Sequence, residues 1–143
     1  MRVNDIKNNP DIGIYSYGSK SKSGKPKAQF EVDVSKFRDP QGQKQFSGMD
    51  GTNPLVRDWV KEDPRLETVV QQARILADDL IKSKPVNDGT KTELKSVSSW
   101  LSISFADIHG KWASPAVAEL VANALEADGY KVYVKHFGIG TGK

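Results

Sequence analysis

Residues 99–136, SWLSISFADIHGKWASPAVAELVANALEADGYKVYVKH, contain the pattern that decides the fold of this chain. Between residues 99 and 105, apolar side chains alternate with serines, which predicts a strand. The pair Ser114-Pro115 then provides an N-cap and a first-turn proline. Apolar residues recur at helical spacing from there to Asp128-Gly129, where glycine favours the left-handed end of a helix. The pattern therefore predicts a strand followed by a helix of about four turns.

A second strand is expected at residues 130–136, YKVYVKH, with Val132 and Val134 facing inward. Strand, helix and strand at this spacing form a βαβ unit, which is right-handed in nearly all proteins. If the second strand runs parallel to and beside the first, His136 emerges at the same edge of the sheet as the loop that follows the first strand. We therefore expect an α/β fold with this unit at its C-terminal end.

The preceding part of the chain supplies the elements that complete and cover the sheet. Residues 12–17 (IGIYSY) and 28–34 (AQFEVDV) are rich in aromatic and β-branched residues and predict two short strands. Residues 54–61 predict a short helix, and Asp63-Pro64 opens a longer one whose apolar face extends to Leu80. We expect a small mixed sheet flanked by helices.

A length of 143 residues fits one domain. We place it at residues 12–137, with an N-terminal extension at residues 1–11 and a flexible tail at residues 138–143. The chain has no cysteine, which excludes disulfides and thiolate metal sites and fits a reducing compartment. No segment has the apolar pattern of a signal peptide or a membrane span, so we expect a cytoplasmic protein without membrane contact.

The composition is that of a folded and slightly basic protein. Hydrophobic residues make up 37% and charged residues 27%, which argues against a disordered chain, although the mean hydropathy of -0.54 is polar. The net charge is +3 and the isoelectric point is about 9.0. So small a charge attracts a polyanion only if it is concentrated on one face.

The loop at residues 105–113, FADIHGKWA, is the first candidate site. In a βαβ unit, the crevice beyond the carboxyl end of the first strand faces the free N–H groups of the following helix. Gly110 permits close approach to the backbone, Lys111 adds a positive charge, and Trp112 could cover a ligand. These features fit an anion or sugar-phosphate site. Every βαβ unit has a strand-to-helix loop at this position, however, and most such loops only connect the two elements. The long irregular connection at residues 35–53 is a second candidate surface.

Catalytic and metal sites have little support in the sequence. Asp107, His109 and His136 could supply a general base and an orienting carboxylate, but no activated nucleophile accompanies them. Two histidines and one aspartate are few for a catalytic zinc, which takes three protein ligands. The chain also lacks a Gly-rich phosphate loop followed by Lys-Ser/Thr. We therefore expect neither metal, ATP nor another cofactor, and a hydrolase or phosphatase-like enzyme is the least favoured alternative.

A lysine-rich loop at residues 19–27, SKSKSGKPK, carries Lys20, Lys22, Lys25 and Lys27. With Tyr15 and Tyr17 on the strand before them, these lysines could contact phosphates beside stacking groups, as in nucleic-acid-binding proteins. An ordinary solvated loop has the same composition, and both interpretations stay open. Trp59 and Trp100 lie in apolar patterns that are typical of a core.

Five segments, taken in order, resemble the C-terminal domain of the RNase adapter protein RapZ over about residues 12–137. The most extensive is the family's strand and loop, LTIAIGCTGGKHRSVxIAE, which aligns without a gap on residues 101–119. The positions kept there are Leu101, Ile103, Gly110, Lys111, Ser114, Ala116, Ala118 and Glu119. Four shorter motifs are similar to residues 15–18, residues 32–35 with Asp39-Pro40, residues 47–50 before residues 56–59, and residues 132–137.

This resemblance implies an α/β domain that forms homo-oligomers, binds structured small RNA and senses an amino-sugar phosphate. The implied ligand pocket consists of Asp33, Ser35, Ser47, Gly48, Asp50, Asp107, His109, Gly110, Lys111, Trp112, Ser114 and His136. The nucleic-acid contacts that we expect are Lys20, Lys22, Lys25, Lys27, Lys111 and Lys135. The implied partners are structured RNA, an RNase or regulatory protein, and a small sugar-derived ligand.

The chain departs from the family pattern where the ligand would be held. The family's loop cysteine is Asp107 here, its His-Arg pair is Trp112-Ala113, the arginine after its FDV strand is Ser35, and its last His-Arg is His136-Phe137. Losing three arginines while adding a carboxylate weakens phosphate binding. We therefore predict a non-catalytic adapter module of RapZ C-terminal type that contacts RNA or a protein partner. A regulatory sensor of sugar or sugar phosphate at residues 105–113 is the alternative.

Overall fold

Five strands form a single sheet in the computed structural model, which describes residues 1–5, 7, 9–20, 24–37, 43–82 and 101–139. The strands are β1 (Arg2–Val3), β2 (Ile12–Gly18), β3 (Phe30–Asp33), β4 (Leu101–Asp107) and β5 (Val132–His136), in the spatial order β1-β5-β2-β4-β3. The four pairings between them are all parallel, so the described sheet is parallel throughout rather than mixed. The predicted α/β class and single domain are confirmed. Because the strands are parallel, their carboxyl ends meet at one edge of the sheet.

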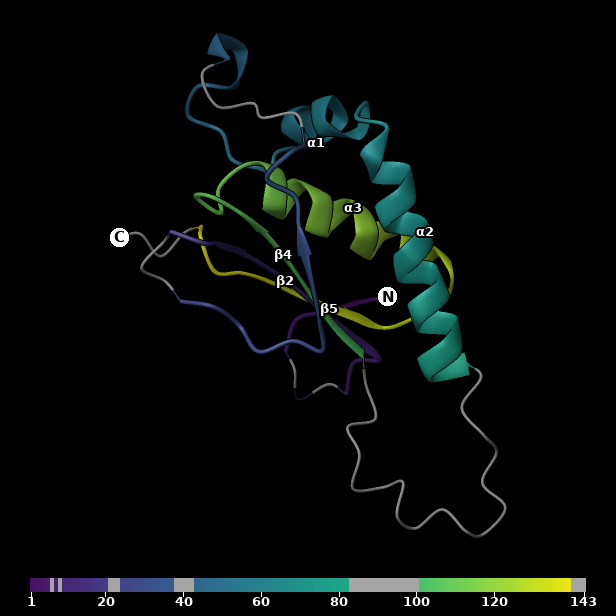
Figure 1. Ribbon diagram of the computed structural model, residues 1–143. Coiled ribbons are helices and arrows are strands. Elements are labelled where there is room, and N and C mark those ends of the chain that lie inside the picture. Colours follow the sequence, from purple (N-terminus) through teal and green to yellow (C-terminus); the bar gives the residue numbers. More distant parts are fainter. Residues whose placement is uncertain (6, 8, 21–23, 38–42, 83–100, 140–143) are drawn as a thin grey trace, which may run out of the picture.

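Three helices, α1 (Pro54–Lys61), α2 (Arg65–Ala77) and α3 (Ala113–Ala127), lie on the same side of the sheet (Figure 1). Helix α3 lies directly on β2, β4 and β5, and α1 and α2 pack against α3. A 3₁₀ turn, η2 (Lys44–Phe46), precedes α1, and a π-helical turn, η3 (Asp78–Lys82), continues α2. Within the described ranges, no helix combines the length and the apolar character that crossing a membrane requires.

The core lies between α3 and the sheet. Its fully buried side chains are Ile12, Ile14, Leu101, Ile103, Phe105 and Val132 from the strands, and Val117, Val121 and Leu125 from α3. Burial of each such side chain contributes roughly 1.5–3 kcal/mol. Helix α2 adds Leu66, Ala73 and Ala77, and Trp59 packs partly buried against this cluster. The apolar faces predicted from the spacing therefore meet one another.

Strand β5 pairs with β2 and not with β4, so the two strands of the C-terminal βαβ unit are not neighbours. The prediction that these two strands lie side by side is therefore wrong. The fully buried strand β2 lies between them, pairing with β4 on one side and with β5 on the other. As a result, His136 stands opposite Ser16 of β2 rather than next to the loop after β4.

The helix termini agree with the sequence patterns in one of three cases. At the start of α2, the N-cap position is Pro64 rather than the predicted Asp63, although the Asp63 carboxylate accepts a hydrogen bond from the Arg65 N–H at 2.9 Å. At the end of α3, Gly129 has the expected left-handed backbone, with φ of 99°. The predicted N-cap at Ser114 is wrong, because α3 already begins at Ala113. The carboxylate of Asp107 performs the capping there instead.

On the opposite face of the sheet, the residues described include no helix. Residues 24–29 run along this side on their way from β2 to β3 (Figure 1). Some predicted features lie outside the described residues, namely Ser99, Trp100, Lys22, the pair Asp39-Pro40 and residues 140–143.

Candidate functional site

The loop between β4 and α3 lies at the carboxyl edge of the sheet and is held from two sides. After β2, the Ser19 N–H donates to the Asp107 carbonyl at 2.8 Å, and the Lys20 N–H donates to the Ile108 carbonyl at 3.0 Å. From the segment before α1, the Gly51 N–H donates to the Lys111 carbonyl at 2.8 Å. The loop that the sequence singled out is therefore a fixed part of the fold.

Three glycines bring three chain segments into backbone contact at this loop. Gly110 has φ of 74°, and a Cβ atom there would overlap the backbone of Tyr17 and Gly18. A Cβ on Gly18 would overlap the backbone of His109, and a Cβ on Gly138 would overlap that of Gly110. Only hydrogen fits at these positions, so the end of β2, the loop and the segment after β5 are stacked without side chains between them.

The carboxylate of Asp107 occupies the N-terminal end of α3. Its Oδ1 accepts hydrogen bonds from the Gly110 N–H and, at 3.2 Å, from the Ser114 hydroxyl. Its Oδ2 accepts from the Ser114 N–H at 3.2 Å. Amide groups at a helix N-terminus carry a partial positive charge and bind phosphates or carboxylates. The chain thus supplies its own anion where the sequence pattern predicted a bound one.

Two adjoining hollows open around Asp107. The first is lined by Ser35, Phe37, Asp107, Ile108, His109, Trp112 and Ala113. The second is lined by Tyr17, Ser19, Glu31, Val32, Asp33, Ser35, Ala106, Asp107 and Ile108. Three of these side chains are carboxylates, and neither hollow is lined by a lysine or arginine. The lining of this region is acidic, which disfavours a phosphate.

The predicted pocket residues are only partly brought together. Those that line the hollows are Asp33, Ser35, Asp107, His109 and Trp112, while Gly110 and Ser114 bind the Asp107 carboxylate. The side chain of Lys111 is exposed, with its Nζ 5.0 Å from the centre of the Trp112 ring. Asp50 accepts a hydrogen bond from the Thr52 N–H at 2.8 Å, and Ser47, Gly48, Asp50 and His136 line neither hollow.

His136 belongs to a separate polar chain between the sheet and α3. The Ser16 Oγ lies 2.7 Å from His136 Nδ1, and Glu119 Oε2 lies 2.8 Å from His136 Nε2. If the serine hydroxyl donates to Nδ1, the ring proton on Nε2 is donated to the carboxylate. The side chains of His136 and Glu119 are 13% and 15% exposed, and Ser16 is fully buried.

Serine, histidine and acid in hydrogen-bonded order resemble the triad of a hydrolase. In such a site, the serine Oγ must reach the carbonyl carbon of a substrate. Ser16 has no exposed surface and lies within the central strand, so a substrate cannot approach its Oγ in this structure. The chain of three groups instead fixes the His136 ring between β2 and α3.

Arg2, which the sequence analysis left out of every site, completes this network. Its Nη1 lies 3.1 Å from Glu119 Oε1, and its Nη2 lies 3.0 Å from Glu126 Oε1. Burial raises the pKa of the Glu119 carboxyl, but hydrogen bonds and charges from His136 and Arg2 outweigh burial and lower that pKa from 4.5 to about 2. No local pattern could have revealed this role, because Arg2 and Glu119 are 117 residues apart in sequence.

Of the predicted nucleic-acid contacts that the structure describes, Lys20, Lys111 and Lys135 lie at or near the carboxyl edge, whereas Lys25 and Lys27 lie in the segment that leads from β2 back to the start of β3. The exposed members are Lys20, Lys25, Lys27, Lys111 and Lys135. Lys25 Nζ lies 3.1 Å from Glu31 Oε1, so its charge is partly compensated. Lys20, Lys111 and Lys135 have no acidic partner within 4.0 Å among the residues that the structure describes.

Comparisons with known proteins agree with this fold and its motifs. Residues 10–140 match the family model described as the RapZ C-terminal domain. The chain is also similar to a nucleotide-binding protein of Cereibacter sphaeroides (strain ATCC 17025 / ATH 2.4.3), with 28% identity over 100 residues. That match covers 70% of this chain but only 30% of the relative, so the chain corresponds to less than a third of that protein.

Replacing Gly110 with alanine is expected to destabilise the domain, because the new Cβ would overlap the backbone of Tyr17 and Gly18. Gly48→Ala is the matched control, since Gly48 has φ of 80° but no atom within 4 Å of its Cβ position. A strained φ alone costs about 1–3 kcal/mol, and we expect G110A to lose about 2 kcal/mol more than G48A. Urea unfolding measures both, and equal losses would contradict the role of the glycine contacts.

Acid is expected to weaken the domain through Glu119. Because the pKa of this carboxyl is lowered from 4.5 to about 2 on folding, its stabilisation is complete above pH 4.5 and is lost as the pH falls towards 2. The difference corresponds to about 3 kcal/mol. Glu119→Gln should flatten the pH dependence of the unfolding free energy in this range, whereas Glu67→Gln, at an exposed position of α2, should not. An unchanged slope in E119Q would show that the ion pairs contribute nothing.

Proposed function

The chain belongs to the RapZ C-terminal domain family, and on this premise we propose that it is a non-catalytic regulatory module that binds structured RNA. The observation that carries the proposal is the gathering of lysines from three segments at the carboxyl edge of the sheet. Lys20 follows β2, Lys111 lies in the loop after β4, and Lys135 lies near the end of β5. Lysines that neutralise phosphates provide most of the affinity for a nucleic-acid backbone.

The backbone contacts of the loop support a joint role for two of these lysines. The Lys20 N–H is bonded to the Ile108 carbonyl, so Lys20 is fastened to the loop that contains Lys111. Both side chains are exposed. A net charge of +3 is small for the whole chain but becomes effective when lysines gather at one edge.

The Asp107 carboxylate at the N-terminus of α3 also favours a large polyanion over a small one as the ligand. Asp107 already accepts hydrogen bonds from Gly110 and Ser114, so a small phosphate would have to displace a tethered carboxylate. An RNA backbone does not depend on these amides, because it can bind the exposed lysines directly. The nucleotide-binding function named for the Cereibacter relative does not require a mononucleotide site here, since the match covers 30% of that protein.

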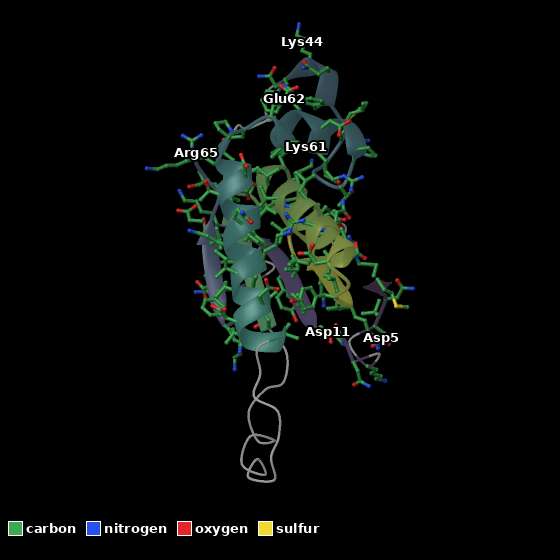
Figure 2. The ribbon with its side chains drawn as sticks, turned by 90° about the vertical axis from the view of Figure 1, so that its right-hand side faces the viewer. Asp5, Asp11, Lys44, Lys61, Glu62 and Arg65 are labelled. Atoms are coloured by element: carbon green, nitrogen blue, oxygen red, sulfur yellow. The ribbon has the colours of Figure 1, made fainter. Side chains whose placement is uncertain are left out.

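Replacing Lys20 and Lys111 together with alanine is expected to weaken the binding of a structured RNA. Each lost phosphate contact should reduce the slope of log affinity against log salt by about 1, so the double variant should lose about 2. Lys44→Ala with Lys61→Ala is the control, because these exposed lysines, both labelled in Figure 2, belong to η2 and α1 rather than to the carboxyl ends of the strands. Fluorescence anisotropy at several salt concentrations measures both quantities.

Three outcomes of this titration decide the proposal. A wild-type affinity that does not fall with salt would contradict RNA binding through lysines. Equal losses in the two double variants would show that the effect is only one of net charge. Absence of RNA binding, together with binding of an RNase or regulatory protein, would assign the domain to a protein partner instead.

The acidic hollows favour a second candidate, a sensor of a small sugar. Glu31, Asp33 and Asp107 contribute carboxylates to the lining, and hydroxyls or an amine of a sugar can donate hydrogen bonds to carboxylates. Trp112 offers an apolar surface against which a sugar ring can pack. In this candidate, the ligand is neutral or carries an amine, and a phosphate on it weakens binding.

A thermal-shift series with a hexose, an amino hexose and their phosphates tests this second candidate. A ligand of the folded state raises the melting temperature, and at one hundred times its Kd it stabilises by about 2.7 kcal/mol. We expect the amino hexose to produce the largest shift and the phosphates to produce smaller ones. No shift at millimolar concentration, or a larger shift with the phosphates, would contradict the acidic-pocket sensor.

A further inference from the structure

A row of aromatic and basic side chains lies on the face of the sheet opposite α3. Side chains alternate along a strand, and His136 faces α3, so the residues on either side of it face away. Tyr133, Lys135 and Phe137 form this row, and Tyr15 of β2 joins it. We call these four residues the β5 stripe.

Contacts within the β5 stripe hold its rings in defined positions. The ring of Tyr15 lies 6.3 Å from that of Tyr133 and 6.0 Å from that of Phe137, with interplanar angles of 72° and 74°. Tyr15 is only 8% exposed, whereas Tyr133 and Phe137 are half-buried. Tyr15 therefore supports two outer rings that remain accessible to a ligand.

The charge of the β5 stripe is positive. Lys135 is exposed, and its Nζ lies 4.9 Å from the centre of the Phe137 ring, without an acidic partner within 4.0 Å in the described part of the chain. Glu31 and Asp33 lie on β3, which is separated from β5 by both β2 and β4. Positive charge beside two aromatic rings matches the chemistry of unpaired nucleotides, which combine phosphates with stacking bases.

We propose that the β5 stripe binds unpaired nucleotides of RNA, with Tyr133 and Phe137 as stacking platforms and Lys135 as a phosphate contact. This inference rests on the proposed RNA-binding function and specifies its surface and the class of RNA segment. A base that stacks on the lysine-covered face of Phe137 displaces the Lys135 ammonium, which then contacts a neighbouring phosphate.

Only unpaired bases can use the two platforms. Because the Tyr15 ring lies 6.3 Å from the Tyr133 ring and 6.0 Å from the Phe137 ring, the centres of the two outer rings are no more than 12.3 Å apart. In a paired stem, each base is stacked between neighbours about 3.4 Å away, so its faces are covered. Bases that stack on the two rings must therefore be free of this stacking, as they are in loops and bulges but not in a stem.

The test compares two RNAs of equal length, one a hairpin with a large unpaired loop and the other a fully paired duplex. Tyr133→Leu with Phe137→Leu removes the aromatic faces but keeps apolar side chains, and Phe30→Leu, at a 37% exposed aromatic of β3, is the matched control. We expect the double variant to bind the loop RNA about ten-fold more weakly and the duplex equally well. Lys135→Ala changes an exposed side chain, and it should weaken loop binding and lower its salt slope by about 1.

The outcomes separate this inference from the function on which it rests. Failure of the wild type to bind either RNA would overturn both proposals. If Lys20→Ala with Lys111→Ala weakens RNA binding while the leucine variant and K135A bind loop RNA as the wild type does, only the β5 stripe is refuted. Equal losses for loop and duplex RNA would also refute stacking. Poly-glutamate is a third probe: if the wild type binds it and the leucine variant loses that binding but keeps RNA binding, the proposal is overturned and the stripe is a surface for acidic proteins.

Discussion

The bonds from the Asp107 carboxylate to the first turn of α3 fix the end of β4 against the start of the helix. Helix α3 lies on three of the five strands, so the position of its N-terminus sets where the sheet is covered and where its edge is left open. A carboxylate tethered by the chain has a high effective concentration at these amides. The same contact thus orders the fold and occupies the place where an external anion would bind.

The chain elements that sequence patterns predicted well are those defined by local spacing. Helix α1 has the bounds predicted for it, and Gly129 has the left-handed backbone expected at the end of α3. The predictions that failed depend on tertiary contacts rather than on local spacing. The position of β5 beside β2 depends on a strand more than a hundred residues earlier, and the start of α3 depends on the carboxylate of Asp107 rather than on Ser114.

In the candidate site too, local patterns predicted the location, whereas the contacts of individual residues depended on the tertiary structure. Its location after β4 followed from the βαβ pattern, and the resemblance brought Asp33, Ser35 and Trp112 to the region that the structure places around it. The sequence could not reveal that Asp107 binds the backbone amides, because a loop aspartate equally suits an exposed position or a ligand contact. Nor could it separate His136 from the site, since that separation depends on β2 lying between β4 and β5.

The charged groups on the two faces of the sheet differ in their partners. On the α3 side, Glu119 is bonded to His136 and Arg2, and groups that satisfy one another leave little charge for a ligand. These pairs join β1 and β5 to α3. On the other side, Lys135 is exposed beside aromatic rings, while Glu31 and Asp33 lie at the far edge. The exposed ammonium of Lys135 and the half-buried rings of Tyr133 and Phe137 therefore lie together and apart from these two carboxylates, as binding of an anionic and aromatic ligand requires.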